Sequence, residues 1–208
     1  RPDLNLNRML QFIAQARQAN AEIIVFSELC LSGYLIGDLW EIDTLVNDFA
    51  DYSNTIRQAS EGLTIIFGNV AIDPEHIGQD GRQRKYNAIY VCSNGQYVQR
   101  PTLPPGLQTG IQPKALHPNY RFFDDDRHFF SLRQLAQEQG CSVYDWIVPF
   151  QIIRRDGTPF TFGVQLCEDI WCQDYTYDND PLDTLHIYHQ RGVDAVFNLS
   201  ASPWTWKK

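Results

Sequence analysis

Three side chains that could act in catalysis are Glu28, Lys114 and Cys167. Glu28 follows residues 23–26 (IIVF), a short β-branched run of the kind found in buried strands. A carboxylate in apolar surroundings has a raised pKa, which suits a general base. The alternative is a glutamate at a strand exit that points to water. Lys114 is one of few cations in its region, and on composition alone a solvated surface lysine is the simpler interpretation.

Cys167 ends the apolar segment 160–167 (FTFGVQLC) and precedes Glu168 and Asp169. A cysteine after an apolar strand is commonly packed in the core. Two acids directly after a buried strand, however, predict that the chain emerges to solvent at Cys167. A thiol at such a position can act as a nucleophile if a base or a cation converts it to the thiolate.

The composition limits the classes of function. The chain has 208 residues, 43% of them hydrophobic and 20% charged, and a net charge of −8. With no basic stripe, this charge argues against nucleic acid or an anionic membrane as the partner. The 5 cysteines fit no zinc spacing, no carboxylate pattern accompanies His186 and His189, and we expect no metal site. Free thiols and the lack of a membrane-length apolar run predict a cytoplasmic protein.

The elements that must position these residues follow from hydrophobic spacing and turn residues. The sequence predicts helices over residues 5–19 and 182–191 and strands over residues 23–26, 63–68, 87–92, 96–99, 147–154, 160–167 and 195–199. The prolines of residues 100–118 predict a long loop there, with no helix or central strand. Hairpins mixed with strand–helix alternation favour a mixed sheet or a two-sheet sandwich flanked by helices.

Four blocks, in this order, resemble the nitrilase, or carbon–nitrogen hydrolase, superfamily. The blocks are SELCLSGY at 27–34, KALHPNYRFFDDDRHF at 114–129, GVQLCEDIW at 163–171 and NLSASP at 198–203. Within the superfamily they are most similar to the glutaminase domains of glutamine-dependent NAD synthetases, and YNA at 86–88 agrees with that pattern. The resemblance covers almost the whole chain.

The resemblance implies an α/β fold, the α-β-β-α sandwich of the nitrilase type, and a catalytic triad of Glu28, Lys114 and Cys167. It implies that Glu28 takes the thiol proton, that Cys167 attacks the carboxamide carbon, and that Lys114 stabilises the oxyanion. Arg100, which also follows the first hairpin, could supply the cation instead. The PNY block follows Lys114 at the family's spacing, which favours Lys114.

The same resemblance implies a substrate pocket around the triad. Its expected residues are Tyr34, Tyr120, Glu168, Ser200 and Ser202. Rim packing is the alternative role for the two tyrosines. A supporting carboxylate is expected at Asp125, where the family usually has the longer glutamate, so its reach to the lysine is open.

We therefore expect residues 1–208 to form one partial carbon–nitrogen hydrolase domain, incomplete at both ends. The implied substrate is glutamine, and the ammonia would serve a separate synthetase domain. No cofactor is expected here, since ATP and Mg would belong to that domain, and a homo-oligomer is expected. Two alternatives stay open: an amidase acting on another small amide or nitrile, and a catalytically inactive scaffold.

Overall fold

The computed structural model describes residues 1–78, 80–172, 176–177 and 180–202. In chain order the elements are α1 (Pro2–Gln18), β1 (Ile23–Val25), η1 (Gly37–Glu41), α2 (Asp43–Gln58), β2 (Thr64–Ile77), β3 (Gln83–Ser93), β4 (Gln96–Tyr97), β5 (Ile111–Pro113), α3 (Asp125–His128), α4 (Leu132–Glu138), η2 (Val143–Trp146), β6 (Phe150–Ile153), β7 (Pro159–Leu166), η3 (Cys167–Ile170), β8 (Thr176–Tyr177), β9 (Asp180–Pro181), α5 (Thr184–Gln190) and β10 (Ala195–Leu199).

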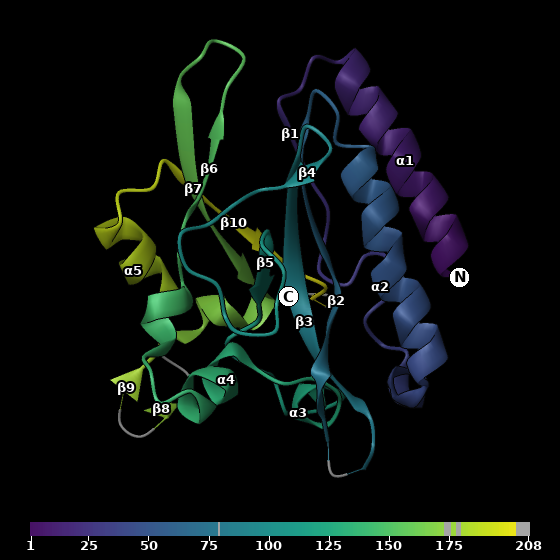
Figure 1. The fold of residues 1–208 in the computed structure, drawn as a ribbon, viewed down its shortest axis with the longest axis vertical. Coiled ribbons are helices and arrows are strands. Elements are labelled where there is room, and N and C mark those ends of the chain that lie inside the picture. Colours follow the sequence, from purple (N-terminus) through teal and green to yellow (C-terminus); the bar gives the residue numbers. More distant parts are fainter. Residues whose placement is uncertain (79, 173–175, 178–179, 203–208) are drawn as a thin grey trace.

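Two sheets form the centre of the molecule. The first has the order β1-β2-β3-β4 with β5 beside β3, and the second has the order β10-β7-β6. Helices α1 and α2 lie on the side of the first sheet that faces away from the second sheet, and α5 lies beyond the second sheet (Figure 1). These layers are the predicted α-β-β-α sandwich, so the predicted fold class is confirmed.

The space between the sheets is filled by apolar side chains from both of them. Ile66 and Val91 of the first sheet share one core cluster with Phe162 and Val164 of the second. All four are at most 2% exposed. Each such side chain contributes roughly 1.5–3 kcal/mol to the free energy of unfolding. This core fixes the two sheets against each other and therefore fixes the ends of their strands.

Strands β2 and β3 are the central pair of the first sheet. They pair antiparallel from Thr64↔Ser93 to Asp73↔Arg84, so both extend beyond the apolar runs that predict them. Residues 64–71 of β2 are all buried, because α2 covers one face and the second sheet the other. A turn at Asn94 and Gly95, both with positive φ, leads from β3 into β4.

One sequence prediction about the fold is wrong in part. Residues 111–113, inside the predicted loop 100–118, form β5, which pairs antiparallel with β3 through Tyr90↔Ile111 and Ala88↔Pro113. Pro113 is the last residue of this short strand, which pairs on one side only. A proline is tolerated there because its missing N–H is not needed for the ladder.

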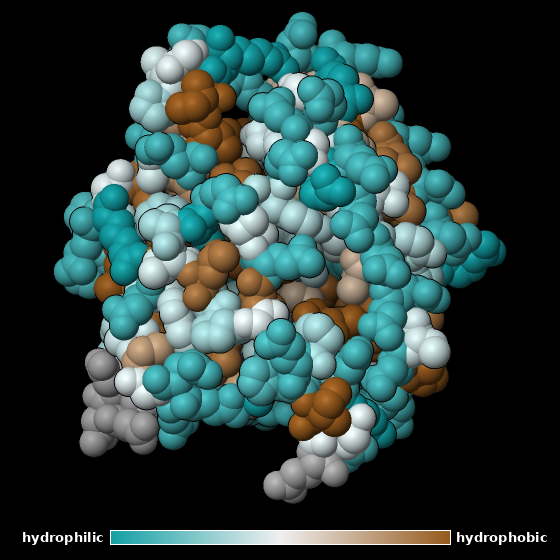
Figure 2. Space-filling model, in the orientation of Figure 1, coloured by the Kyte–Doolittle hydropathy of each residue, from teal (hydrophilic) through white to brown (hydrophobic). Residues whose placement is uncertain are grey.

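One face of the molecule carries both hydrophilic and hydrophobic residues (Figure 2). In Figure 2, brown hydrophobic groups are scattered among teal hydrophilic ones rather than joined in one patch. Among the described residues, no helix combines the length and the hydrophobicity needed to cross a membrane. The expectation of a single domain over residues 1–208 stays a prediction.

Candidate active site

Glu28 lies just beyond the end of β1 and is 2% exposed. The next residue, Leu29, has a φ of +44°, which turns the chain sharply after the carboxylate. The backbone of β2 lies directly against this turn: a Cβ added at Gly68 would be 2.6 Å from Glu28 Cα. A glycine at position 68 therefore lets the Glu28 backbone approach the first sheet closely.

Lys114 follows β5 and is 1% exposed. Its backbone N–H donates to the Asn87 carbonyl of β3 at 2.8 Å, so the sheet holds the lysine in register. The ammonium Nζ lies 2.8 Å from Glu28 Oε1 and 2.9 Å from Asp125 Oδ2. Burial alone would lower the pKa of Lys114, but the two carboxylates outweigh it and hold that pKa well above its usual value.

Asp125, in the first position of α3, completes what we call the charged cluster: Glu28, Lys114 and Asp125. Its second oxygen accepts a hydrogen bond from the Tyr34 hydroxyl. The Lys114 ammonium also lies 5.5 Å from the centre of the Tyr34 ring, within range of a cation–π interaction. Aspartate at position 125, although shorter than glutamate, thus contacts the Lys114 ammonium directly.

Glu28 has two further hydrogen-bond partners. Asn87 of β3 donates from Nδ2 to Glu28 Oε1 at 2.8 Å, and the Ala201 backbone N–H donates to Oε2 at 3.0 Å. Both carboxylate oxygens are therefore fixed in direction. The role of Asn87 was not found from the sequence, although a polar residue inside the apolar strand YNAIYVC was a usable signal.

Cys167 lies where β7 ends and η3 begins, and it is half-buried. Its φ is +37°, a left-handed conformation that L-residues other than glycine rarely adopt. Its Sγ is 3.3 Å from Ser202 Oγ. Burial and the negative charge of Glu28 raise the pKa of the thiol, while Ser202 and the Lys114 ammonium oppose this rise only in part.

The prediction that the chain emerges to solvent directly after Cys167 is wrong. Glu168 and Asp169 do not lead the chain out of the core, because each is only 4% exposed. They are tolerated inside because their carboxylates accept hydrogen bonds: Glu168 from the Tyr120 hydroxyl, and Asp169 from backbone N–H groups. The thiol of Cys167 is nevertheless partly exposed, as predicted.

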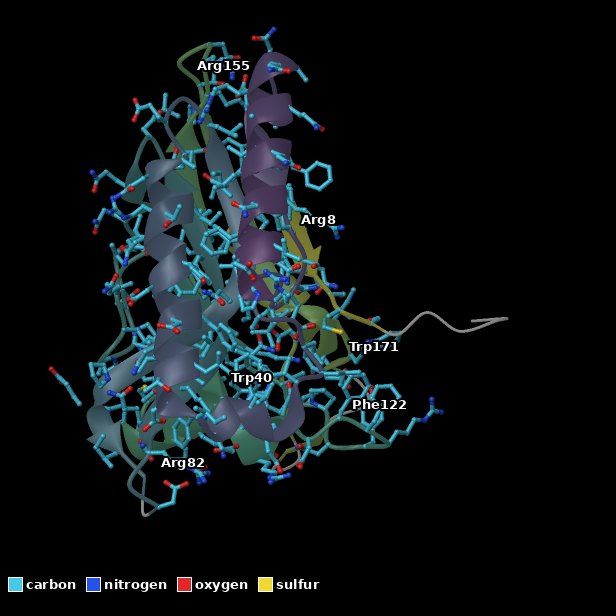
Figure 3. The ribbon with its side chains drawn as sticks, turned by 90° about the vertical axis from the view of Figure 1, so that its right-hand side faces the viewer. Arg8, Trp40, Arg82, Phe122, Arg155 and Trp171 are labelled. Atoms are coloured by element: carbon cyan, nitrogen blue, oxygen red, sulfur yellow. The ribbon has the colours of Figure 1, made fainter. Side chains whose placement is uncertain are left out.

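The residues expected around the substrate lie near the predicted triad: Ser202 lies against Cys167, and Tyr34 lies against Lys114 and Asp125. Tyr120, 46% exposed, donates to Glu168 Oε1 at 3.2 Å, and Ser200 Oγ accepts from Asn198 Nδ2 at 3.0 Å. Phe122 and Trp171 come from different parts of the chain and project from the same side of the molecule (Figure 3). The structure thus gathers Tyr34, Tyr120, Glu168, Ser200 and Ser202 around the predicted triad.

Arg100, the alternative cation, lies elsewhere. It is 6% exposed, its Nη1 donates to Gln112 Oε1, and its guanidinium lies 4.6 Å from the centre of the Phe150 ring. It makes no contact with Glu28 or Cys167 that would suit it to catalysis. The geometry therefore supports Lys114 as the cation of the site.

Comparison with known proteins gives relatives along the whole chain, although no family model matches. The glutamine-dependent NAD(+) synthetase of Acinetobacter baylyi is 25% identical over 202 residues, which are 97% of this chain and 29% of that protein. The enzyme of the same name from Synechocystis is 26% identical over 98% of this chain and 32% of that protein. The chain therefore spans about a third of the length of these relatives.

Solved structures agree with these relatives. A glutamine-dependent NAD+ synthetase from Acinetobacter baumannii superposes with a TM-score of 0.68 at 25% identity, over 99% of this chain and 31% of that one. An amidase of the nitrilase superfamily from Nesterenkonia superposes with a TM-score of 0.63 at 12% identity, over 96% of this chain and 60% of that one. The chain has the nitrilase fold.

The resemblance that the four sequence blocks indicated is thereby confirmed along nearly the whole chain. In another structure of the Nesterenkonia amidase, the acetamide moiety of fluoroacetamide is bound covalently to the active-site cysteine of that protein. A nitrilase fold therefore accommodates a thiol that attacks a small carbon electrophile.

Proposed function

We propose that this chain is a carbon–nitrogen hydrolase that cleaves the side-chain amide of glutamine through a thioester on Cys167. One observation carries the proposal: the buried Lys114 ammonium contacts Glu28, Glu28 accepts from the Ala201 N–H, and the next residue, Ser202, lies 3.3 Å from Cys167 Sγ. The names of the relatives supply the substrate, because they are glutamine-dependent enzymes. A base, a cation and a thiol in this arrangement suit acyl transfer.

In the proposed reaction, Glu28 takes the thiol proton and the Cys167 thiolate attacks the carboxamide carbon. The Lys114 ammonium stabilises the oxyanion of the tetrahedral intermediate. The carbon–nitrogen bond then breaks, and ammonia leaves with the proton that Glu28 returns. Water attacks the thioester with Glu28 again as base, which releases glutamate and restores the thiol. Asp125 and Asn87 keep Lys114 and Glu28 in place throughout.

We further propose that the ammonia serves ATP-dependent NAD synthesis by a synthetase domain of a longer protein. The relatives are about three times longer than this chain, which supports a further domain. ATP and magnesium would belong to that domain, and the hydrolase reaction itself needs no cofactor. A cytoplasmic location and a homo-oligomer also remain proposals.

Substrate comparison tests the choice of glutamine. The full-length protein is assayed for ammonia release from glutamine, from other ω-amides and from small nitriles. We expect glutamine to have the highest kcat/KM. A preference for another small amide would instead favour the alternative of a stand-alone amidase, which the fold of the Nesterenkonia amidase keeps open.

Trapping with an electrophilic glutamine analogue tests the nucleophile. We expect mass spectrometry to find one label, on Cys167, and Cys167→Ser to abolish both the label and ammonia release. Cys172→Ser is the matched control, because Cys172 is half-buried and only five positions further along. A label on Cys30 or Cys172 would contradict the assignment, and no label with no turnover would indicate the inactive scaffold.

A further inference from the structure

Asp169 is a buried acid to which the proposed mechanism gives no task. It lies in η3, two residues after Cys167, and is 4% exposed. Its carboxylate accepts three backbone hydrogen bonds. Oδ1 accepts from the N–H groups of Ala115 and Leu116 at 3.0 and 2.8 Å, and Oδ2 accepts from the N–H of Leu166 at 3.0 Å. These bonds compensate the loss of water around the buried carboxylate.

The donors of these bonds flank the two catalytic side chains. Ala115 and Leu116 directly follow Lys114, and Leu166 directly precedes Cys167. One carboxylate therefore bridges a segment that continues from the first sheet and a segment that ends the second sheet. Among the described residues, no backbone–backbone hydrogen bond joins these segments, so Asp169 supplies the direct polar link between them.

The turn at Cys167 also depends on this carboxylate. The positive φ of Cys167 is unfavourable for a residue with a Cβ, and such a conformation persists only when its surroundings hold it. The bond from Leu166 N–H to Asp169 Oδ2 closes the turn around the thiol. The Thr184 hydroxyl of α5 also donates to the Asp169 backbone carbonyl at 3.2 Å. Hydrogen bonds from Leu166 and from Thr184 therefore both hold η3 in place.

We propose that Asp169 is a positioning residue that sets the separation between the Lys114 ammonium and the Cys167 thiol. It acts through the backbone and touches neither reacting group. This inference rests on the proposed hydrolase function, because it takes Lys114 and Cys167 as the catalytic pair.

Asp169→Asn in the full-length protein tests the link. The asparagine amide has the same shape as the aspartate carboxylate, but one of its two oxygens is replaced by an NH2 group. This group cannot accept from a backbone N–H, so the hydrogen bonds to one of the two segments are lost. We expect kcat to fall about 100-fold, as for a small misplacement of catalytic groups, with KM changed less than about threefold. We also expect the pH profile of Cys167 alkylation to move to higher pH, because the Lys114 charge that lowers the thiol pKa moves away.

Asp183→Asn is the matched control. Asp183 caps α5 by accepting the His186 N–H at 2.9 Å, and it lies outside the catalytic segments. We expect this variant to lose some stability while keeping kcat and the alkylation profile. If Asp169→Asn does not fold, Asp169→Glu retains both acceptors and is expected to change both readouts in the same direction, to a smaller extent.

The alkylation profile separates the two proposals, because it requires no turnover. A wild-type protein that hydrolyses no amide would refute the proposed function, and the profile would still report on the bridge. A folded Asp169→Asn variant, or the folded glutamate variant in its place, with wild-type kcat and a wild-type alkylation profile would overturn the positioning role.

Discussion

The charged cluster lies in the dry interior of the molecule, whereas the Cys167 thiol lies half-buried at the end of β7. The side chains of Lys114, Glu28 and Asp125 are 0%, 1% and 4% exposed, and every charge among them has a partner. The thiol lies 3.3 Å from the Ser202 hydroxyl, and the Cys167 backbone is strained by its positive φ. Electrostatic interactions are strongest where water is excluded, which favours burial of the charged cluster. A substrate must reach the thiol, which favours partial exposure of Cys167. The contrast shows how one site meets both requirements.

The largest effect is expected when the charged cluster loses its cation. Lys114→Met leaves Glu28 and Asp125 as buried carboxylates without a counter-charge. We expect this to lower the free energy of unfolding by about 3–5 kcal/mol, measured by urea denaturation, and to abolish ammonia release. Arg127→Met is the control, because its ion pair with Asp38 is exposed and is worth less than about 1 kcal/mol. Equal losses for the two variants would contradict a special role of burial.

The next effect concerns the contact between the cluster and the first sheet. Gly68→Ala places a methyl group 2.6 Å from Glu28 Cα and from the Leu29 nitrogen, so the Glu28 turn must move. We expect a loss of about 1–3 kcal/mol in stability. We also expect kcat to fall about 100-fold, since the base is displaced. A variant with wild-type kcat would show that the turn adapts without moving the carboxylate.

The cluster and the thiol communicate through charge, which pH dependence can measure. Glu28 raises the pKa of the thiol and Lys114 lowers it. Thiolate should therefore appear at lower pH in Glu28→Gln and at higher pH in Lys114→Met. The measurement is the rate of Cys167 alkylation against pH by mass spectrometry. Turnover of Glu28→Gln should nevertheless fall about 10³-fold, because the base is lost.

Cys30 is an internal control for this titration. Burial raises its pKa to about 12, so it should stay unreactive up to about pH 10 in every variant. If Glu28→Gln moved the pH profile of Cys167 alkylation to higher pH instead, this would contradict the expected effect of the Glu28 charge on the thiol.

The smallest effect is expected on the thiol side. Ser202→Ala removes the hydroxyl that lies 3.3 Å from Cys167 Sγ and that lowers the thiol pKa. We expect kcat/KM to fall roughly 3- to 10-fold, the range of a single hydrogen bond. Ser142→Ala, which removes the cap of η2 outside the site, should leave kcat/KM unchanged. A loss beyond about 100-fold would mean that Ser202 takes part in the chemistry itself.

The sequence was sufficient to predict the central strands, and it also predicted that Glu28, Lys114 and Cys167 come together. Short apolar runs such as residues 63–68 predict buried strands because both faces of the sheet are covered. The prediction that Glu28, Lys114 and Cys167 come together rested on the order of the motifs. Local spacing could not supply it, because Glu28 and Lys114 are 86 positions apart and Lys114 and Cys167 are 53 positions apart. The confirmed resemblance supplied that step.

Other features could not be found, or were misread, for physical reasons. Helix α2 went unpredicted, although Val46, Phe49 and Ile56 form a buried face, because the residues between them are mostly polar. β5 was not predicted because the prolines of residues 100–118 indicate a loop. The sequence alone predicts that Asp169 faces solvent, because the three backbone donors that satisfy its carboxylate come together only in the folded chain.

The bond from Ala201 N–H to Glu28 Oε2 has a consequence for synthesis of the protein. It joins residues 173 positions apart, so the carboxylate acquires its full set of contacts only after almost the entire described chain has left the ribosome. Contacts of such long sequence separation form late, after the slow closure of the intervening polypeptide. A nascent chain that has not reached residue 201 therefore has an incompletely oriented acid, so the proposed hydrolysis begins only after Ala201 has reached Glu28.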